Sequence, residues 1–315
     1  MDSSTLGDPG AGFHEGELHV QQQAGVLADA SGLEAMLDSR DLSPGTAMFL
    51  AQRTLAAISA RDAGGVLWVS PLVGPAGFLD VVGPRDLRIE AVPSIGDPLR
   101  GLPTGQEVGL IAVDFARRRR VRLNGLLTVA DSGTLVVRVE QAFGNCPQYI
   151  QEREVAPATA EGATEPTRVR AARPDDRLSP ADITQIREAD TFVLGSSHPT
   201  RGSDASHRGG PPGFVRVDDD RTLWWPDYPG NNMFTSLGNL AVDPVAALLF
   251  LDFVAGRALH LTGRAELAPV PLGAPGDDSG TGRRVWFQLD HRTSTTSPAV
   301  QRGATGAYAK NPPLT

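Results

Sequence analysis

The chain carries one glycine-rich pattern twice, as Gly74-Pro75-Ala76-Gly77-Phe78 and as Gly210-Pro211-Pro212-Gly213-Phe214. At the same offset, Leu42-Ser43-Pro44 recurs as Leu178-Ser179-Pro180. With two more residues in the second copy, Leu110 to Phe115 matches Leu248 to Phe253. A period this long indicates a duplicated domain, because the repeats of solenoid proteins span about 20–50 residues.

The repeat predicts how the chain is divided. A length of 315 residues leaves room for two domains of ordinary size. We expect a polar, glycine-rich and loosely attached N-terminal arm at 1–40, a first domain at 41–155, a linker at 156–178, a second domain at 179–292 and a C-terminal tail at 293–315. The tail contains few large apolar residues, and we expect it to be disordered or to lie over the surface.

Each copy opens with the same local signal and continues with short apolar runs. Ser43-Pro44 and Ser179-Pro180 combine a helix-capping serine with a proline that suits the first helical position, which predicts a short helix. The apolar runs Val108–Phe115 and Ala246–Phe253 are typical of central strands buried on both faces. Short strands separated by Gly/Pro turns indicate a mainly β fold with a few short helices, as a small antiparallel barrel in each copy.

Composition excludes several classes of function. The chain has 37 acidic and 29 basic residues, and this acidic balance argues against nucleic acid as a partner. No apolar stretch approaches a membrane span and no secretory signal is visible, so a cytoplasmic protein without membrane contact is expected. The six histidines and Cys146 lack the spacing of a metal site, and none is predicted. Lys310 is the only lysine, so arginine must bind any anion held by a charged side chain.

A position-by-position comparison of the two copies shows residues that only the second copy has, most of them polar. Three differences stand out: Arg216 replaces Asp80, His207-Arg208 replaces Pro71-Leu72, and Trp225 replaces Ile89. A run of four arginines, 117–120 in the first copy, is expected at a solvent-exposed hairpin tip.

A candidate anion site follows Trp225. A helix is predicted to start near Asn231 or Asn232 and to end at Asp243-Pro244. Free N–H groups at a helix start, together with an arginine on a neighbouring strand, are suited to bind a phosphate. The matching loop of the first copy contains Asp97, which would repel an anion, so we predict a single anion site in the second copy.

These motifs resemble a known family. The motifs that carry the resemblance are Ser206-His207-Arg208-Gly209-Gly210, the segment from Trp225 to Asn232, the stretch from Leu248 to Ala265, and Phe143-Gly144-Asn145-Cys146-Pro147 with Tyr149-Ile150. They are similar to FMN-binding split-barrel proteins related to pyridoxamine 5′-phosphate oxidase, and the last motif resembles the long, two-barrel branch. The resemblance implies two tandem split β-barrels that form an intrachain pseudo-dimer with FMN in the groove between them.

The same resemblance assigns roles to individual residues. Arg216, Asn231 and Asn232 would meet the FMN phosphate, and Trp225 and Ser236 would lie near the phosphate or the ribityl chain. His207 and Arg208 would face the ring or the substrate as candidate catalytic groups. Asn145 and Tyr149 would reach the flavin from the first barrel.

The implied function is an FMN-dependent oxidoreductase that acts on a small organic substrate. Two alternatives stay open at this point: a flavin-binding or partner-docking module without turnover, and a split-barrel enzyme that uses a deazaflavin or haem. The resemblance also leaves open a homo-oligomer or a separate reductase as partner.

Overall fold

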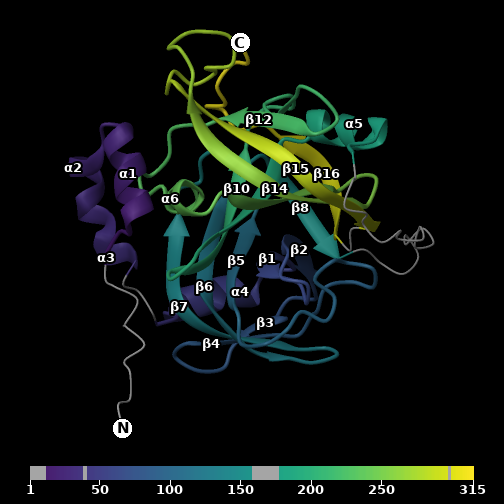
Figure 1. The fold of residues 1–315 in the computed structure, drawn as a ribbon. Coiled ribbons are helices and arrows are strands. Elements are labelled where there is room, and N and C mark those ends of the chain that lie inside the picture. Colours follow the sequence, from purple (N-terminus) through teal and green to yellow (C-terminus); the bar gives the residue numbers. More distant parts are fainter. Residues whose placement is uncertain (1–11, 38–40, 158–176, 297–298) are drawn as a thin grey trace.

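The computed structural model describes residues 12–37, 41–157, 177–296 and 299–315, without the side chains of residues 35, 36, 145 and 300–303. Two seven-stranded antiparallel sheets dominate it (Figure 1). The first contains β1 (Leu55–Arg61), β2 (Leu67–Val73), β3 (Leu79–Val81), β4 (Asp86–Ile89), β5 (Glu107–Asp114), β6 (Arg119–Ala130) and β7 (Leu135–Asn145). The second contains β9 (Thr191–His198), β10 (Gly202–Gly209), β11 (Arg216–Val217), β12 (Thr222–Pro226), β13 (Val245–Asp252), β14 (Arg257–Pro269) and β15 (Arg283–Thr296).

The two sheets have the same topology. The strand order is β2-β1-β5-β6-β7-β4-β3 in the first and β10-β9-β13-β14-β15-β12-β11 in the second, so each strand has a counterpart eight numbers later. The apolar runs expected as central strands are β5 and β13, which lie between β1 and β6 and between β9 and β14. The predicted mainly β fold of two tandem split barrels is confirmed.

The predicted opening helices are present in both copies. In α4 (Pro44–Ala51) the Ser43 hydroxyl accepts the Thr46 N–H at 3.1 Å. In α5 (Pro180–Glu188) the Ser179 hydroxyl accepts the Asp182 N–H, and the Asp182 carboxylate accepts the Ser179 N–H at 2.7 Å. Both helices begin where they do because a side chain satisfies N–H groups that the first turn leaves free.

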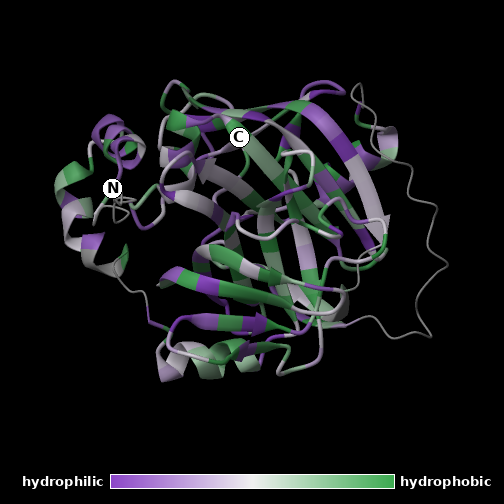
Figure 2. Ribbon diagram, turned by 60° about the horizontal axis from the view of Figure 1, so that its bottom comes forward, coloured by the Kyte–Doolittle hydropathy of each residue, from purple (hydrophilic) through white to green (hydrophobic). Residues whose placement is uncertain are grey.

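The two halves pack against each other through small and branched apolar side chains. These are Ala57, Leu67, Val69 and Ile111 from the first half and Ala205, Ala247, Leu249 and Ala258 from the second. Glycine allows the closest approach: a Cβ on Gly109 would lie 2.4 Å from the carbonyl carbon of Asp204. Hydrophobic residues gather on the strands in the middle of the molecule (Figure 2). The halves therefore form an intrachain pseudo-dimer.

Both chain ends are held more firmly than the sequence predicts. The arm forms α1 (Glu15–Gln23), α2 (Leu27–Ala30), the 3₁₀ helix η1 (Ser31–Leu33) and α3 (Glu34–Leu37), and α1 packs on α6 (Thr235–Val242; Figure 1). Beyond β15, β16 (Ala299–Gly306) pairs with β8 (Glu152–Pro157) of the first half. The tail is thus partly a strand that joins the halves. Residues 158–176 of the predicted linker lie outside the described residues.

Within the described parts of the chain, no helix combines the length and the apolar character needed to cross a membrane.

Candidate functional site

A pocket lies between the two halves. From the first half it is lined by Arg120 and Arg122 on β6 and by the segment from Cys146 to Tyr149. From the second half it is lined by the end of β10 (Ser206–Gly209), the segment 225–232 and the start of α6. The pocket therefore brings together His207, Arg208, Trp225, Asn231, Asn232, Ser236 and Tyr149, which the sequence proposed as site residues.

A buried ion pair crosses between the halves next to this pocket. Arg122 of β6 pairs with Asp204 of β10, and its Nε donates to Asp204 Oδ1 at 3.0 Å. The other oxygen of Asp204 accepts the Ser236 hydroxyl at 2.8 Å. Both charged side chains are almost fully buried, so each needs the other as counter-charge. The ion pair fixes Ser236, and with it the first turn of α6, relative to the first half.

Two further arginines of the pocket lack a direct ion pair of this kind. Arg120 and Arg208 form no ion pair with a carboxylate of the described residues. Burial, reinforced by Arg122 and Arg208, lowers the pKa of Arg120 to about 9. Burial also lowers the pKa of Arg208. Because arginine stays protonated in proteins, these shifts mean that positive charge is held in a desolvated place, where Asp204 and Asp227 offset that of Arg208 only in part.

His207 lies against this charge as a neutral imidazole. Its Nδ1 is 2.8 Å from Arg120 Nη1, which can only donate, so the ring proton is on Nε2. Nε2 is buried and finds no acceptor among the described residues. Burial and the neighbouring arginines keep the pKa of His207 well below its usual value. His207 can therefore donate a hydrogen bond at neutral pH but is poorly suited to accept a proton.

The start of α6 presents unsatisfied donors to the pocket. Its capping residue, Phe234, has a left-handed backbone with φ of 57° and offers no side-chain cap. The N–H groups of Thr235, Ser236 and Leu237 have no acceptor in the described part of the chain. This helix begins three to four residues later than the sequence predicts. Asn231 does not cap it, because the Asn231 carboxamide oxygen accepts the Met233 N–H at 3.3 Å.

Arg216 does not line the pocket and is bound to another partner, in contrast to the prediction that it meets a phosphate. Its guanidinium donates to Asp278 through two hydrogen bonds of 2.6 and 2.8 Å and stacks on Trp224, 5.0 Å from the ring centre. The Asp278 side chain is fully buried. The replacement of Asp80 by Arg216 therefore reflects a partner on a loop 62 residues later.

Of the other proposed residues, all but Asn145 line the pocket. Trp225 is only 1% exposed and packs edge-on against Phe192 at 5.0 Å, so it is mainly core. Asn232 has a left-handed backbone, with φ of 61°. Tyr149 crosses from the first half, donates its hydroxyl to the Pro229 carbonyl at 3.0 Å and stacks near Tyr228. Asn145 ends β7 opposite Arg120, and its side chain lies outside the described residues.

The sequence reasoning missed Arg120 and Arg122. The sequence predicts Arg120 at an exposed hairpin tip, whereas it lies in β6, and Arg122, two residues later, shares its face. The second copy has Ala258 and His260 at the corresponding positions. Comparing the matched positions of β6 and β14 in the same way identifies both arginines.

One group of potential metal ligands lies outside the pocket. Ligand atoms of His14, Glu15 and His198 lie within 4.8 Å of one another. Both imidazoles, however, accept a backbone N–H at Nδ1, from Gly16 and from Thr200. Their protons are therefore on Nε2, where they point to Asn239 Oδ1 and Glu15 Oε1. In this arrangement neither ring has a lone pair free for a metal.

Comparisons with known proteins show what the second half is similar to. No curated protein matches the chain. Among solved structures, a putative pyridoxamine 5′-phosphate oxidase from Lactobacillus delbrueckii is 13% identical over 37% of this chain and 93% of its own, with a TM-score of 0.30. A FAD binding protein from Mycobacterium smegmatis is 12% identical over 40% of this chain and 97% of its own, with a TM-score of 0.26. Residues 180–271 match the family profile described as pyridoxamine 5′-phosphate oxidase. This match covers most of the second barrel and less than a third of the chain.

Proposed function

We propose that the chain binds one FMN in the pocket between its halves and acts as an oxidoreductase on a small organic substrate. The observation that carries the proposal is the buried positive charge of Arg120 and Arg208, which form no ion pair with a carboxylate of the described residues, beside the uncapped start of α6. A phosphate group carries up to two negative charges at neutral pH and would balance the two guanidinium groups. The N–H groups of the first helical turn would add hydrogen bonds to its oxygens.

The chain's overall charge supports an anionic ligand in this pocket. With a net charge of −8, two unpaired arginines in one pocket are not a by-product of composition. Two acids also lie there, but Asp204 is paired with Arg122, and Asp227 accepts Arg283 Nε at 2.9 Å. The pocket therefore retains positive charge that favours an anionic ligand.

The remaining groups suit a planar ligand next to the phosphate. FMN, when bound, supplies the hydride chemistry. The His207 Nε2–H would donate a hydrogen bond to an acceptor on the ring or on the substrate, which would satisfy a donor that is otherwise buried alone. Tyr149 and Tyr228, whose ring centres are 4.9 Å apart, would limit access of water at the edge of the pocket.

Arg208→Gln tests the proposal. Removing a charged hydrogen-bond partner costs about 1.5–3 kcal/mol, so the dissociation constant for FMN should rise about 10- to 150-fold. The affinity for riboflavin, which lacks the phosphate, should change little. Fluorescence titration of the purified apoprotein with each ligand measures both.

A matched control is Arg284→Gln. Arg284 stacks on Trp224 and Trp286 and does not line the pocket, so its replacement should leave both affinities unchanged. Equal loss of FMN and riboflavin in Arg208→Gln would place Arg208 at the ring or the substrate. A wild-type chain that binds neither flavin would reject the proposed function.

The structure also predicts one FMN per chain. At the equivalent place on the other side of the interface between the halves, the counterpart of Arg122 is His260 of the second copy, which is fully buried and bonded to the Val69 carbonyl and to Thr295. Asp97 accepts the Ser70 hydroxyl at 2.5 Å in this place, and burial raises its pKa. An anion there would meet a carboxylate and no helix start. Titration of the full chain should reach its end point at one equivalent, and two equivalent sites would contradict the asymmetry.

A further inference from the structure

The N-terminal arm is attached to the helix that borders the pocket. Gly16 of α1 packs so closely on Gly238 of α6 that a Cβ added to Gly16 would lie 2.1 Å from the Gly238 carbonyl oxygen. A capping box sets the start of α1 at this point: His14 Nδ1 accepts the Gly16 N–H, and Glu17 accepts the His14 N–H at 2.9 Å. Only glycine at both positions permits this distance between the helices.

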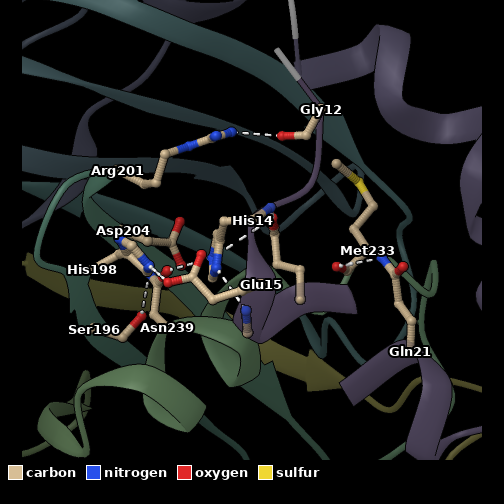
Figure 3. A network of polar contacts seen from close by, with 12 residues as sticks. Gly12, His14, Glu15, Gln21, Ser196, His198, Arg201, Asp204, Met233 and Asn239 are labelled. Carbon is tan, nitrogen blue, oxygen red and sulfur yellow. Dashed lines mark hydrogen bonds and ion pairs between the residues drawn. The ribbon is translucent and has the colours of Figure 1, made fainter. Parts of the chain in front are cut away.

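Polar contacts extend the attachment along α6. His14 Nε2 donates to Asn239 Oδ1 at 3.1 Å, and Asn239 Nδ2 in turn donates to Ser196 of β9 at 3.1 Å (Figure 3). His198 Nε2 lies 3.1 Å from Glu15 Oε1. Because α1 is largely hydrophilic, these specific contacts, rather than a broad apolar face, fix its position (Figure 2).

The arm also holds the turn that leads into α6. Asn232 and Phe234, on either side of Met233, both have left-handed backbones, which cost energy for residues other than glycine. Gln21 donates to the Met233 carbonyl at 3.3 Å (Figure 3). The Met233 side chain is buried in a cluster with Phe13, Ala30 and Leu37 of the arm and Phe143 of β7. Arm residues therefore stabilise a strained turn whose next residues line the pocket.

We infer that the arm is a positioning element of the pocket: by clamping Met233, Gly238 and Asn239 it fixes the start of α6 where the ligand's anionic group binds. The part of this inference that concerns the ligand rests on the proposed function. The part that concerns α6 does not, since it follows from contacts within the chain.

The test compares two identical substitutions in the arm of the full-length protein. Gly16→Ala places a methyl group against α6, whereas Gly32→Ala adds one where no atom lies within 4 Å. Amide hydrogen exchange across α6 should become faster in Gly16→Ala and stay unchanged in Gly32→Ala, with exchange in the two central sheets unaltered in both. FMN should then bind Gly16→Ala about tenfold or more weakly, as expected when hydrogen bonds from the start of α6 to a charged phosphate are lost. The affinity for riboflavin should change little.

Gln21→Ala provides a second variant if Gly16→Ala does not fold. It removes the hydrogen bond to Met233 without adding volume, and it should speed exchange across α6 in the same direction. Unchanged exchange across α6 in both variants would overturn the inference, and so would faster exchange with unchanged FMN affinity. Failure of the wild-type chain to bind FMN would instead reject the proposed function. The two outcomes can be told apart because the exchange measurement requires no ligand.

Discussion

Arg216→Gln is expected to lower the free energy of unfolding by about 3 kcal/mol and to leave the affinity for FMN unchanged. The Asp278 side chain is fully buried and accepts both hydrogen bonds of the Arg216 guanidinium. Glutamine would leave this carboxylate without its counter-charge, with only neutral donors such as the Thr315 hydroxyl at 3.0 Å. Urea unfolding followed by circular dichroism measures the loss, and flavin titration measures the affinity.

The first copy contains a natural control for this substitution. Asp80 occupies the position of Arg216 there and pairs with Arg88 at 2.6 Å, but both side chains are more than 40% exposed. Exposed pairs contribute little, so Arg88→Gln should change the stability by less than about 1 kcal/mol. If Arg216→Gln were as stable as the wild type but bound FMN weakly, Arg216 would contact the FMN phosphate, as the sequence predicts.

A fragment of residues 179–315 is expected to bind FMN at least about 100-fold more weakly than the full chain, or to recover binding only as a dimer. The pocket loses Arg120, Arg122 and Tyr149 when the first half is removed. The apolar face with Ala205, Ala247 and Leu249 also becomes exposed, which favours self-association. Light scattering gives the mass in solution, and absorbance gives the flavin content of the same sample.

Adding residues 1–157 as a separate chain provides the control. Restored flavin binding in the mixture would attribute the loss to the missing first half rather than to misfolding of the fragment. A monomeric fragment that holds FMN as tightly as the full chain would show that the first half contributes nothing to the site.

The parts of the fold that could be read from the sequence are those with local or repeated signals. Ser43 and Ser179 cap their helices through bonds to residues three positions ahead, so short motifs were enough to find both helix starts. The internal repeat predicted two barrels, and they have identical strand orders. The resemblance of the second copy also indicated the segments that line the pocket. Hydrogen bonds between neighbours and hydrophobic periodicity act within a few residues, and the sequence displays them directly.

The charge balance of the site depends on partners far apart in the chain. Arg122 meets Asp204 across 82 residues, and Arg216 is neutralised by Asp278 on a loop with no recognisable signal. His14 bonds to Asn239 across 225 residues, and this contact attaches the arm, which is expected to be loose, to the helix that borders the pocket. Whether an arginine remains free to bind an anion depends on which carboxylate the folded chain brings within about 4 Å. That distance is set by the packing of two barrels and an arm, and no local pattern encodes it.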